Sequence, residues 1–372
     1  MKRKALFTFI FLLLPPAMIF AQGQKASLNL SLKQAQEYAV ANNKVVKSAK
    51  LDVIASRAAL WETISAALPS VEGSGSFTDN LKLMTTLLPG EFFGQPGTKI
   101  PVTFGSKYNT GVSVQASMLL FNAPLYIGIE TTKLANKLSE QNLERTELDI
   151  KESVSTAYFL ILVSEQSLRI LDENIANLNE TLKSTKAMYQ VGMAESTDVD
   201  QMESNVTMTE NSRSSLLRNI ELDYNLLRFQ LGVPGNTEIS LTETLESLTD
   251  QINVDAILSQ NFDLNNNIDY KLITGQEEIS ALTLMSQKAS VLPTLAGFYT
   301  YGSNGMGDKI SEQRWFQNSM AGLQLSIPVF ASGQRYAKIK QAQLNLNKAR
   351  NNKTLVADQL LMQEKQLRYD LV

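Results

Sequence analysis

The chain has 372 residues, enough for one large domain or two, and a formal net charge of −3. This charge gives no reason to expect nucleic acid as a partner. The chain has no cysteine and no histidine, which excludes disulfides, thiolate or imidazole metal sites, and nucleophile pairs that need either residue. We therefore expect no metal and no cofactor, and an exported protein without catalytic activity fits better than an enzyme.

Residues 1–21 have the pattern of a secretory signal peptide. Three basic residues at positions 2–4 precede an apolar run from Leu6 to Leu14, and Ala21 offers a small residue at the cleavage point. The run is too short to span a bilayer, and no later segment has about 20 uninterrupted apolar residues. If the mature chain enters a membrane, it must therefore do so through strands.

Two parts of the mature chain repeat the order helix, strand, strand, helix. A helical pattern ends at Leu68-Pro69-Ser70 in the first part and at Leu292-Pro293-Thr294 in the second. A repeat of about 200 residues is too long for a solenoid unit and indicates a duplicated half-molecule. We assign residues 22–247 to the first structural repeat and residues 248–372 to the second, which we expect to be incomplete because the chain stops inside it.

Local signals set the first elements. Ser31 and Gln34 imitate a capping box before a helix expected over residues 32–67. Residues 70–79 are small and aromatic and predict a weak strand, whereas the Pro- and Gly-rich residues 80–107 predict a loop.

Alternation predicts the next strand and its counterpart in the second repeat. Over residues 111–121, Val112 and Val114 lie on one face and Ser and Gln on the other. Over residues 321–330, Gly, Gln and Ser alternate with apolar residues that include Leu323, Leu325 and Ile327. Strands of about 10 residues have the length of a transmembrane strand. The apolar face is expected to meet lipid or a neighbouring chain, and the uncharged polar face a water-filled lumen.

A helical pattern runs from Pro124 to Tyr189 with apolar residues spaced four and three apart. This period of 3.5 predicts a coiled coil, whereas an amphipathic helix on a globular core would show 3.6. The expected seam consists of Ile150, Val154, Ala157, Ile161, Ser164, Leu168, Leu171, Ile175, Leu178, Leu182, Thr185 and Tyr189.

Gly192 interrupts this helix, and a return helix begins near Ser196 and ends before Gly232, which predicts an antiparallel hairpin. Its expected seam consists of Val199, Met202, Val206, Leu217, Ile220, Tyr224, Leu227 and Leu231.

The rest of the chain continues this pattern. Residues 236–252 predict a polar connector, residues 255–291 a helix with a break around 265–267, and residues 334–370 a final helix.

The search for catalytic chemistry finds little. Glu195, Asp198 and Asp200 would suit a metal or acid–base cluster, but their place at the start of a helix favours a capping and dipole role. No catalytic, cofactor or metal residue is assigned.

The main physical question is how the open edges of the predicted sheet are closed. Four strands cannot enclose a lumen, because the smallest closed barrels use about 8, and an open edge is not permitted in hydrocarbon. The strands therefore belong to a small soluble sheet, as in a periplasmic coiled-coil adaptor, or close by joining strands of other copies. A symmetric oligomer with a short barrel and a long helical tube would satisfy both the strands and the coiled coil.

The chain resembles the TolC-like outer membrane efflux protein family. The motifs are Tyr189-x-x-Gly192 before Thr197-Asp198-Val199, then Leu231-Gly232, and later Pro328-Val329-Phe330 before Gly333. The resemblance implies a mainly α fold with a small β part. Long antiparallel coiled-coil helices form an α-helical tunnel, and four transmembrane β-strands per protomer join a trimeric β-barrel.

The resemblance also implies partners and a location. These are a homotrimer in the cell outer membrane with its helical part in the periplasm, a periplasmic adaptor protein and an inner-membrane transporter. Tyr189, Gly192, Thr197 and Asp198 would lie at the tip, where Asp198 bonds to a basic residue of a second hairpin to close the entrance. That second hairpin is not complete in this sequence.

Overall fold

The computed structural model describes residues 27–371, which form two compact units. We call residues 27–39 with 153–249 the hairpin unit, and residues 40–152 with 250–371 the sheet unit. The expected signal peptide lies outside the described residues. The order helix, strand, strand, helix occurs twice, but the boundaries of the two repeats stay a prediction.

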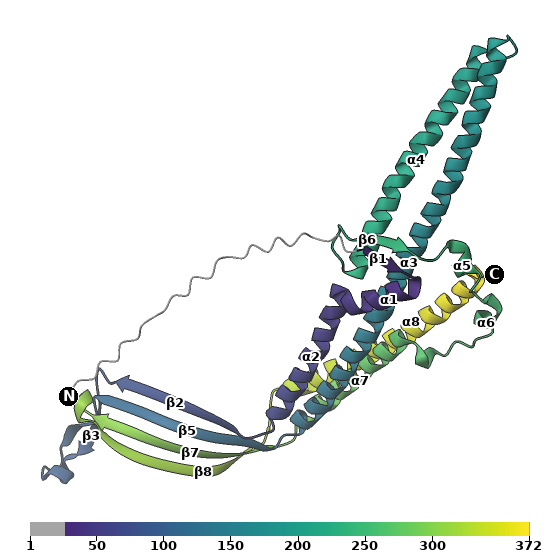
Figure 1. Ribbon diagram of the computed structural model, residues 1–372. Helices are drawn as coiled ribbons and strands as arrows, with labels where there is room; N and C mark the ends of the chain where they lie inside the picture. Colours follow the sequence, from purple (N-terminus) through teal and green to yellow (C-terminus); the bar gives the residue numbers. More distant parts are fainter. Residues whose placement is uncertain (1–26, 372) are drawn as a thin grey trace, which may run out of the picture. The chain divides into compact units, whose positions relative to one another are not determined.

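The sheet unit contains a four-stranded antiparallel sheet in the order β2-β5-β7-β8 (Figure 1). Its strands are β2 Ser70–Asp79, β5 Tyr108–Phe121, β7 Thr294–Gly307 and β8 Arg314–Ser326. The outer edges of β2 and β8 pair with no strand of residues 27–371. The strands expected over residues 70–79 and 111–121 are confirmed. The strand expected to end at Phe330 ends at Ser326 instead, ahead of Pro328, which has no N–H to donate to a ladder.

The segment expected to be a loop, residues 80–107, contains its own hairpin. β3, Met84–Pro89, pairs with β4, Lys99–Phe104, and a short 3-10 helix, η1, Gly90–Phe93, joins them. Gly94 ends η1 with φ +77°, a conformation that favours glycine. The loop prediction was wrong because Pro and Gly here form the turn of a hairpin rather than a structureless segment.

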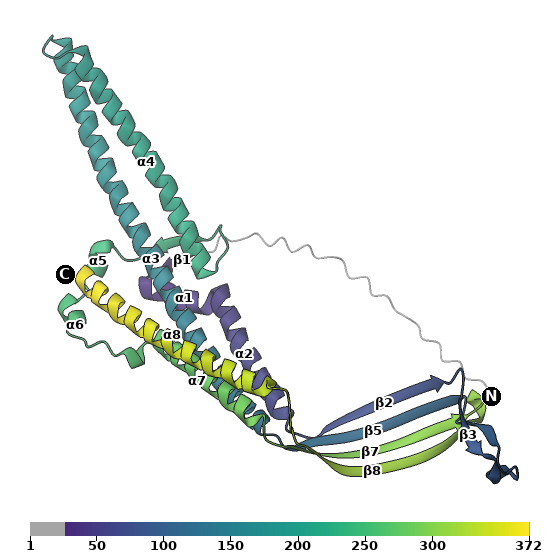
Figure 2. The same ribbon diagram turned by 180° about the vertical axis from the view of Figure 1, so that it is seen from behind.

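Four helices of the sheet unit lie in the same order as the strands. The helices are α2 Lys44–Ser65, the first part of α3 Ala123–Gln190, α7 Ile268–Ala289 and α8 Gln334–Asp370. Arg57 of α2 pairs with Glu140 of α3, and Leu138 of α3 lies against Gly275 of α7. α7 and α8 run side by side in both views and pack through Leu284, Ile339, Ala342 and Leu346 (Figure 2).

Two helices expected to be long are divided. The helix expected over residues 32–67 is α1, Leu32–Asn42, followed by α2, because the Asn43 side chain accepts from the Val45 N–H at 2.7 Å and caps a new helix. The helix expected over residues 255–291 is α6, Val254–Leu258, then η2, Leu264–Asn266, then α7. The break expected around residues 265–267 is therefore confirmed.

The hairpin unit consists mainly of the second part of α3 and the antiparallel α4, Ser196–Leu231 (Figure 1). Over residues 170–190, all of them described, the side chains that are not exposed are Leu171, Ile175, Leu178, Leu182 and Thr185. Their spacing of four and three confirms the heptad seam in this part of α3. Tyr189, the last expected member, is 49% exposed and lies beyond the seam.

On α4 one seam residue was assigned wrongly. Leu217 is 41% exposed, whereas its neighbour Leu216 is half-buried and stands three residues after Arg213 and four before the buried Ile220. The seam therefore passes through Leu216.

A two-stranded sheet holds residues 27–30 in this unit. β1, Ser27–Leu30, pairs in parallel with β6, Glu238–Leu241, within the expected connector, which also contains α5, Leu245–Thr249. The Tyr158 hydroxyl donates to the Leu30 carbonyl at 3.1 Å, and the Leu32 N–H donates to the Glu243 carboxylate at 2.7 Å. Burial raises the pKa of Tyr158 to about 12, so this hydroxyl remains a donor at neutral pH.

No helix of residues 27–371 combines the length and the apolar character needed to cross a membrane.

Adjacent leucines test the seam of α4. Leu216→Asp places a charge between α3 and α4 and should lower the free energy of unfolding by about 2 kcal/mol or more. Leu217→Asp, one residue away on the exposed face, should change it by less than about 0.5 kcal/mol. Thermal unfolding followed by circular dichroism measures both. Equal melting temperatures for the two variants would show that the seam does not pass through Leu216.

Candidate functional site

The strand register assigns each residue of the four-stranded sheet to one of two faces, because residues directly opposite each other in antiparallel strands share a face. Val114 lies opposite Tyr301, and Leu323 and Leu325 lie opposite Gly297 and Leu295. This first face is mainly apolar. Its apolar and aromatic members are Val71, Phe77, Tyr108, Val112, Val114, Ala116, Met118, Phe121, Leu295, Tyr299, Tyr301, Trp315, Ala321, Leu323 and Leu325.

The apolar face is also uncovered by the rest of the described chain. Leu323 is 70% exposed, Leu325 58% and Val112 52%. Ile327 shows 56% exposure but follows the last residue of β8, so its assignment to a barrel strand was wrong. Tyr299 and Tyr301 also belong to this face and were not predicted, although their alternation in β7 was a usable signal.

The opposite face carries hydroxyl and amide side chains. The hydroxyl oxygens of Ser70 and Ser117 lie 3.0 Å apart, and those of Ser74 and Ser113 lie 2.8 Å apart. These pairs therefore form hydrogen bonds between β2 and β5. The polar members are Ser70, Glu72, Ser74, Ser76, Thr78, Asn109, Ser113, Gln115, Ser117, Thr294, Thr300, Asn304, Arg314, Asn318, Gln324 and Ser326. Only Glu72 and Arg314 among them carry a charge.

Some apolar side chains also lie on this polar face. Phe298 is the clearest example, and it has a structural reason: its ring covers Gly322, where a Cβ would approach it to 2.7 Å. An aromatic ring over a strand glycine fills the space left by the missing side chain.

The second site is the turn between α3 and α4. Gly192 has φ +76°, and its N–H donates to the Tyr189 carbonyl at 3.0 Å while the Met193 N–H donates to the Met188 carbonyl at 2.8 Å. These bonds satisfy the last carbonyls of α3, and they need the left-handed conformation that glycine adopts at no steric cost. Val191 and Met193 project at 70% and 79% exposure, so the turn presents apolar side chains to its surroundings.

The acids after the turn act locally. The Asp198 carboxylate accepts from the Glu195 N–H at 3.0 Å, and the Thr197 hydroxyl donates to the Glu195 carboxylate at 3.3 Å. Asp198 therefore caps the start of α4, which confirms the capping role predicted from the sequence. No group of three or more acids within residues 27–371 has a geometry that could hold a metal ion, so Glu195, Asp198 and Asp200 form no such cluster.

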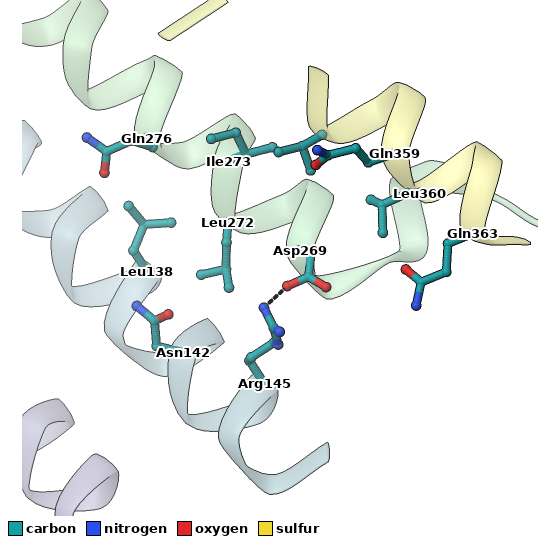
Figure 3. A pocket seen from close by; sticks show the side chains of 11 residues that line it. Leu138, Asn142, Arg145, Asp269, Leu272, Ile273, Gln276, Gln359, Leu360 and Gln363 are labelled. Carbon is teal, nitrogen blue, oxygen red and sulfur yellow. Dashed lines mark hydrogen bonds and ion pairs between the residues drawn. The ribbon is translucent and has the colours of Figure 1, made fainter. Parts of the chain in front are cut away.

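A third feature is an open pocket of 540 Å³ in the sheet unit, between α3, α7 and α8 (Figure 3). Arg145 of α3 forms an ion pair with Asp269 of α7 on its wall, and amides such as Asn142, Gln276 and Gln363 line the same pocket. Arg145 and Asp269 are 124 residues apart in the sequence, and no local pattern marks them as partners. The pocket offers no nucleophile next to a base.

Comparisons with known proteins point to one protein family. Residues 35–233 match the family model described as outer membrane efflux protein. The proteases secretion protein PrtF of Dickeya chrysanthemi is 21% identical over 207 residues, which are 55% of this chain and 45% of PrtF. The chain thus spans less than half the length of that curated relative.

Solved structures share the fold. A membrane protein from Pseudomonas aeruginosa superposes with a TM-score of 0.71 at 14% identity, over 93% of this chain and 77% of its own. The outer membrane protein VceC from Vibrio cholerae superposes with a TM-score of 0.69 at 15% identity, over 89% of this chain and 76% of its own. Because the family match alone covers more than half of the residues, the chain belongs to the outer membrane efflux protein family.

Proposed function

We propose that this protein is the outer membrane channel component of a tripartite efflux or type I secretion system and acts as a passive conduit for export. The observation that carries the proposal is the four-stranded sheet, which has one exposed apolar face and one face with mainly uncharged hydroxyl and amide groups. Membrane barrels have this division between a lipid-facing and a lumen-facing surface. The family described above supports the same conclusion.

On this proposal, Val112, Val114, Leu323 and Leu325 face lipid in the barrel wall. The cross-strand serines and the amides of the opposite face line the lumen. Neutral hydrogen-bonding groups keep the lumen hydrated and do not select strongly among exported molecules by their charge, as a passive conduit requires.

Closure comes from other copies of the same chain. β2 and β8 are the free edges of the sheet, and α2 and α8 are the outermost helices of the layer that follows the same order. α2 has a second apolar seam, exposed and in heptad spacing, at Leu51, Ile54 and Trp61. Joining the β8 and α8 side of one copy to the β2 and α2 side of the next makes a head-to-tail ring. We infer a homotrimer.

The turn of the hairpin unit is the docking tip in this proposal. Its exposed Val191 and Met193 suit an apolar contact with a periplasmic adaptor protein that joins the channel to an inner-membrane transporter. The helices would then lie in the periplasm and the sheet in the outer membrane. Closure of the entrance by Asp198 and a basic residue of a second hairpin remains part of this proposal.

The general experiment examines the purified mature chain in detergent. A trimer sensitive to heat in gel electrophoresis, with stepwise conductance in planar bilayers, is the expected result. A monomer that stays soluble without detergent would instead support a periplasmic coiled-coil adaptor and contradict the channel.

The faces of β8 give a direct test. Leu325→Arg places a charge on the apolar face and should cost about 2–4 kcal/mol if that face lies at the middle of the bilayer. Gln324→Arg, on the neighbouring position of the opposite face, should be tolerated because the lumen is aqueous. Heat-modifiable trimer in outer membrane fractions is measured for both variants. Equal amounts of trimer would contradict the assignment of the faces.

The second seam of α2 tests the ring. Trp61→Glu should remove a large apolar contact between copies and leave mostly monomer, whereas Glu62→Lys, next to the seam, should leave the trimer intact. Size-exclusion chromatography with light scattering distinguishes the two. A trimer of unchanged stability in Trp61→Glu would mean that this seam faces something other than a second copy.

Two exposed methionines of the hairpin unit test the docking tip. Met193→Asp should weaken capture of the adaptor at least about tenfold, the loss of roughly 1.4 kcal/mol. Met208→Asp, on α4 at 67% exposure but away from the turn, should bind the adaptor normally. Both variants should remain trimeric. Normal adaptor binding by Met193→Asp would exclude the turn as the contact.

A further inference from the structure

A second, smaller pocket of the sheet unit has a distinct chemistry. It has a volume of 230 Å³, lies between α3, α7 and α8, and shares no lining residue with the pocket of Figure 3. Each of the three helices contributes one lysine to its lining: Lys137 from α3, Lys271 from α7 and Lys353 from α8. Sites for drug-sized ligands usually occupy about 300–1,000 Å³, so this pocket suits a small group.

The lining is positively charged. Three lysines against one glutamate, Glu278, leave a net charge of +2. Lys137 and Lys271 form no ion pair with any residue of 27–371. Lysines that line one small pocket make its electrostatic potential positive, which favours a bound anion.

Charges just outside the pocket do not cancel this excess. Glu277 pairs with Lys353 at 3.1 Å and with Arg350 at 3.3 Å, so its one negative charge is shared between two cations. The hydrogen bond from Lys353 holds the pKa of Glu277 below its usual value, and the carboxylate stays ionised. Lys353 also lies over the Tyr270 ring, with Nζ 5.4 Å from the centroid. These contacts fix Lys353 in place.

The pocket also contains an unpaired hydroxyl. Thr274 Oγ1 is buried and has no hydrogen-bond partner among residues 27–371, although most threonines in these helices donate to a carbonyl four residues earlier. Thr274 lines the same pocket as the lysines, and Gln141 and Asn265 add amide groups. A buried polar atom without a partner costs free energy that a ligand can recover.

We propose that this pocket binds a small oxyanion with at least two negative charges, such as a phosphate group, through Lys137, Lys271 and Lys353 with a hydrogen bond from Thr274. Lysine ammonium groups bind phosphate as point charges from several directions. A neutral ligand would leave the excess charge, and a cation would increase it. The phosphate belongs either to a soluble compound or to a phospholipid headgroup, and the test separates these two sources.

The test measures binding to the purified full chain in a neutral detergent. Thermal unfolding is followed with sodium pyrophosphate and, separately, with phosphatidic acid, whose phosphomonoester headgroup can carry two negative charges, in mixed micelles. Both probes are used at constant ionic strength set by sodium chloride. Wild type should show a higher melting temperature with one or both probes. Lys271→Gln and Lys137→Gln should each weaken binding about tenfold. A response to the lipid alone assigns the site to a headgroup, and a response to pyrophosphate assigns it to a soluble phosphate.

Three variants separate binding from folding. Lys338→Gln removes a charge on α8 outside the pocket and should bind as wild type does, and Lys271→Arg should retain binding. Without ligand, Thr274→Val should have a melting temperature no lower than that of wild type, since it removes an unpaired hydroxyl. With the probe, its melting temperature should rise less than that of wild type. No shift with either probe, or equal shifts in Lys271→Gln and Lys338→Gln, would overturn the proposal. Because the readout is binding and not export, it is independent of the channel function.

Discussion

The outer edges of β2 and β8 carry backbone N–H and C=O groups that no strand of residues 27–371 pairs, and the sheet between them has an exposed apolar face. Water could satisfy the edges, but it would leave the apolar face exposed. Lipid would cover the apolar face, but it cannot satisfy the edges. Only strands supplied by other chains meet both demands. The open sheet therefore requires assembly before it can enter a membrane, and the other features of the sheet unit agree with this requirement.

The helices extend the same constraint beyond the sheet. Each strand of the four-stranded sheet continues into, or follows from, one of the helices α2, α3, α7 and α8, so the outermost helices belong to the outermost strands. α2 must then have two partners, and its sequence has two seams. Val46 and Val53 are buried within the chain, whereas Leu51, Ile54 and Trp61 are exposed. A single helix with two heptad seams is suited to the wall of a tube, where every helix has a neighbour on both sides.

Periodic features could be predicted from the sequence, and features that depend on distant partners could not. The alternation around Val112 and Leu323 and the heptads through Leu171 each extend over many residues. One residue that departs from the pattern therefore does not obscure the period. Leu216 and Leu217 are both leucine, and only the position of α3 decides which one is buried. The break at Asn43 depends on one side-chain hydrogen bond. The lysines of the small pocket come from three helices, and no local pattern connects them.

The polar face of the sheet suits the proposed function as a conduit. A surface that binds its cargo tightly would slow passage, because an export conduit must release whatever enters. The polar face of the sheet meets this demand with serines that bond to each other across β2 and β5 and with side-chain amides, and only Glu72 and Arg314 are charged. On the proposed function, discrimination between cargoes would come from the partner proteins that load the channel. The specific features of this chain are then the surfaces proposed to contact partners: the strand edges, the second seam of α2 and the exposed turn around Gly192.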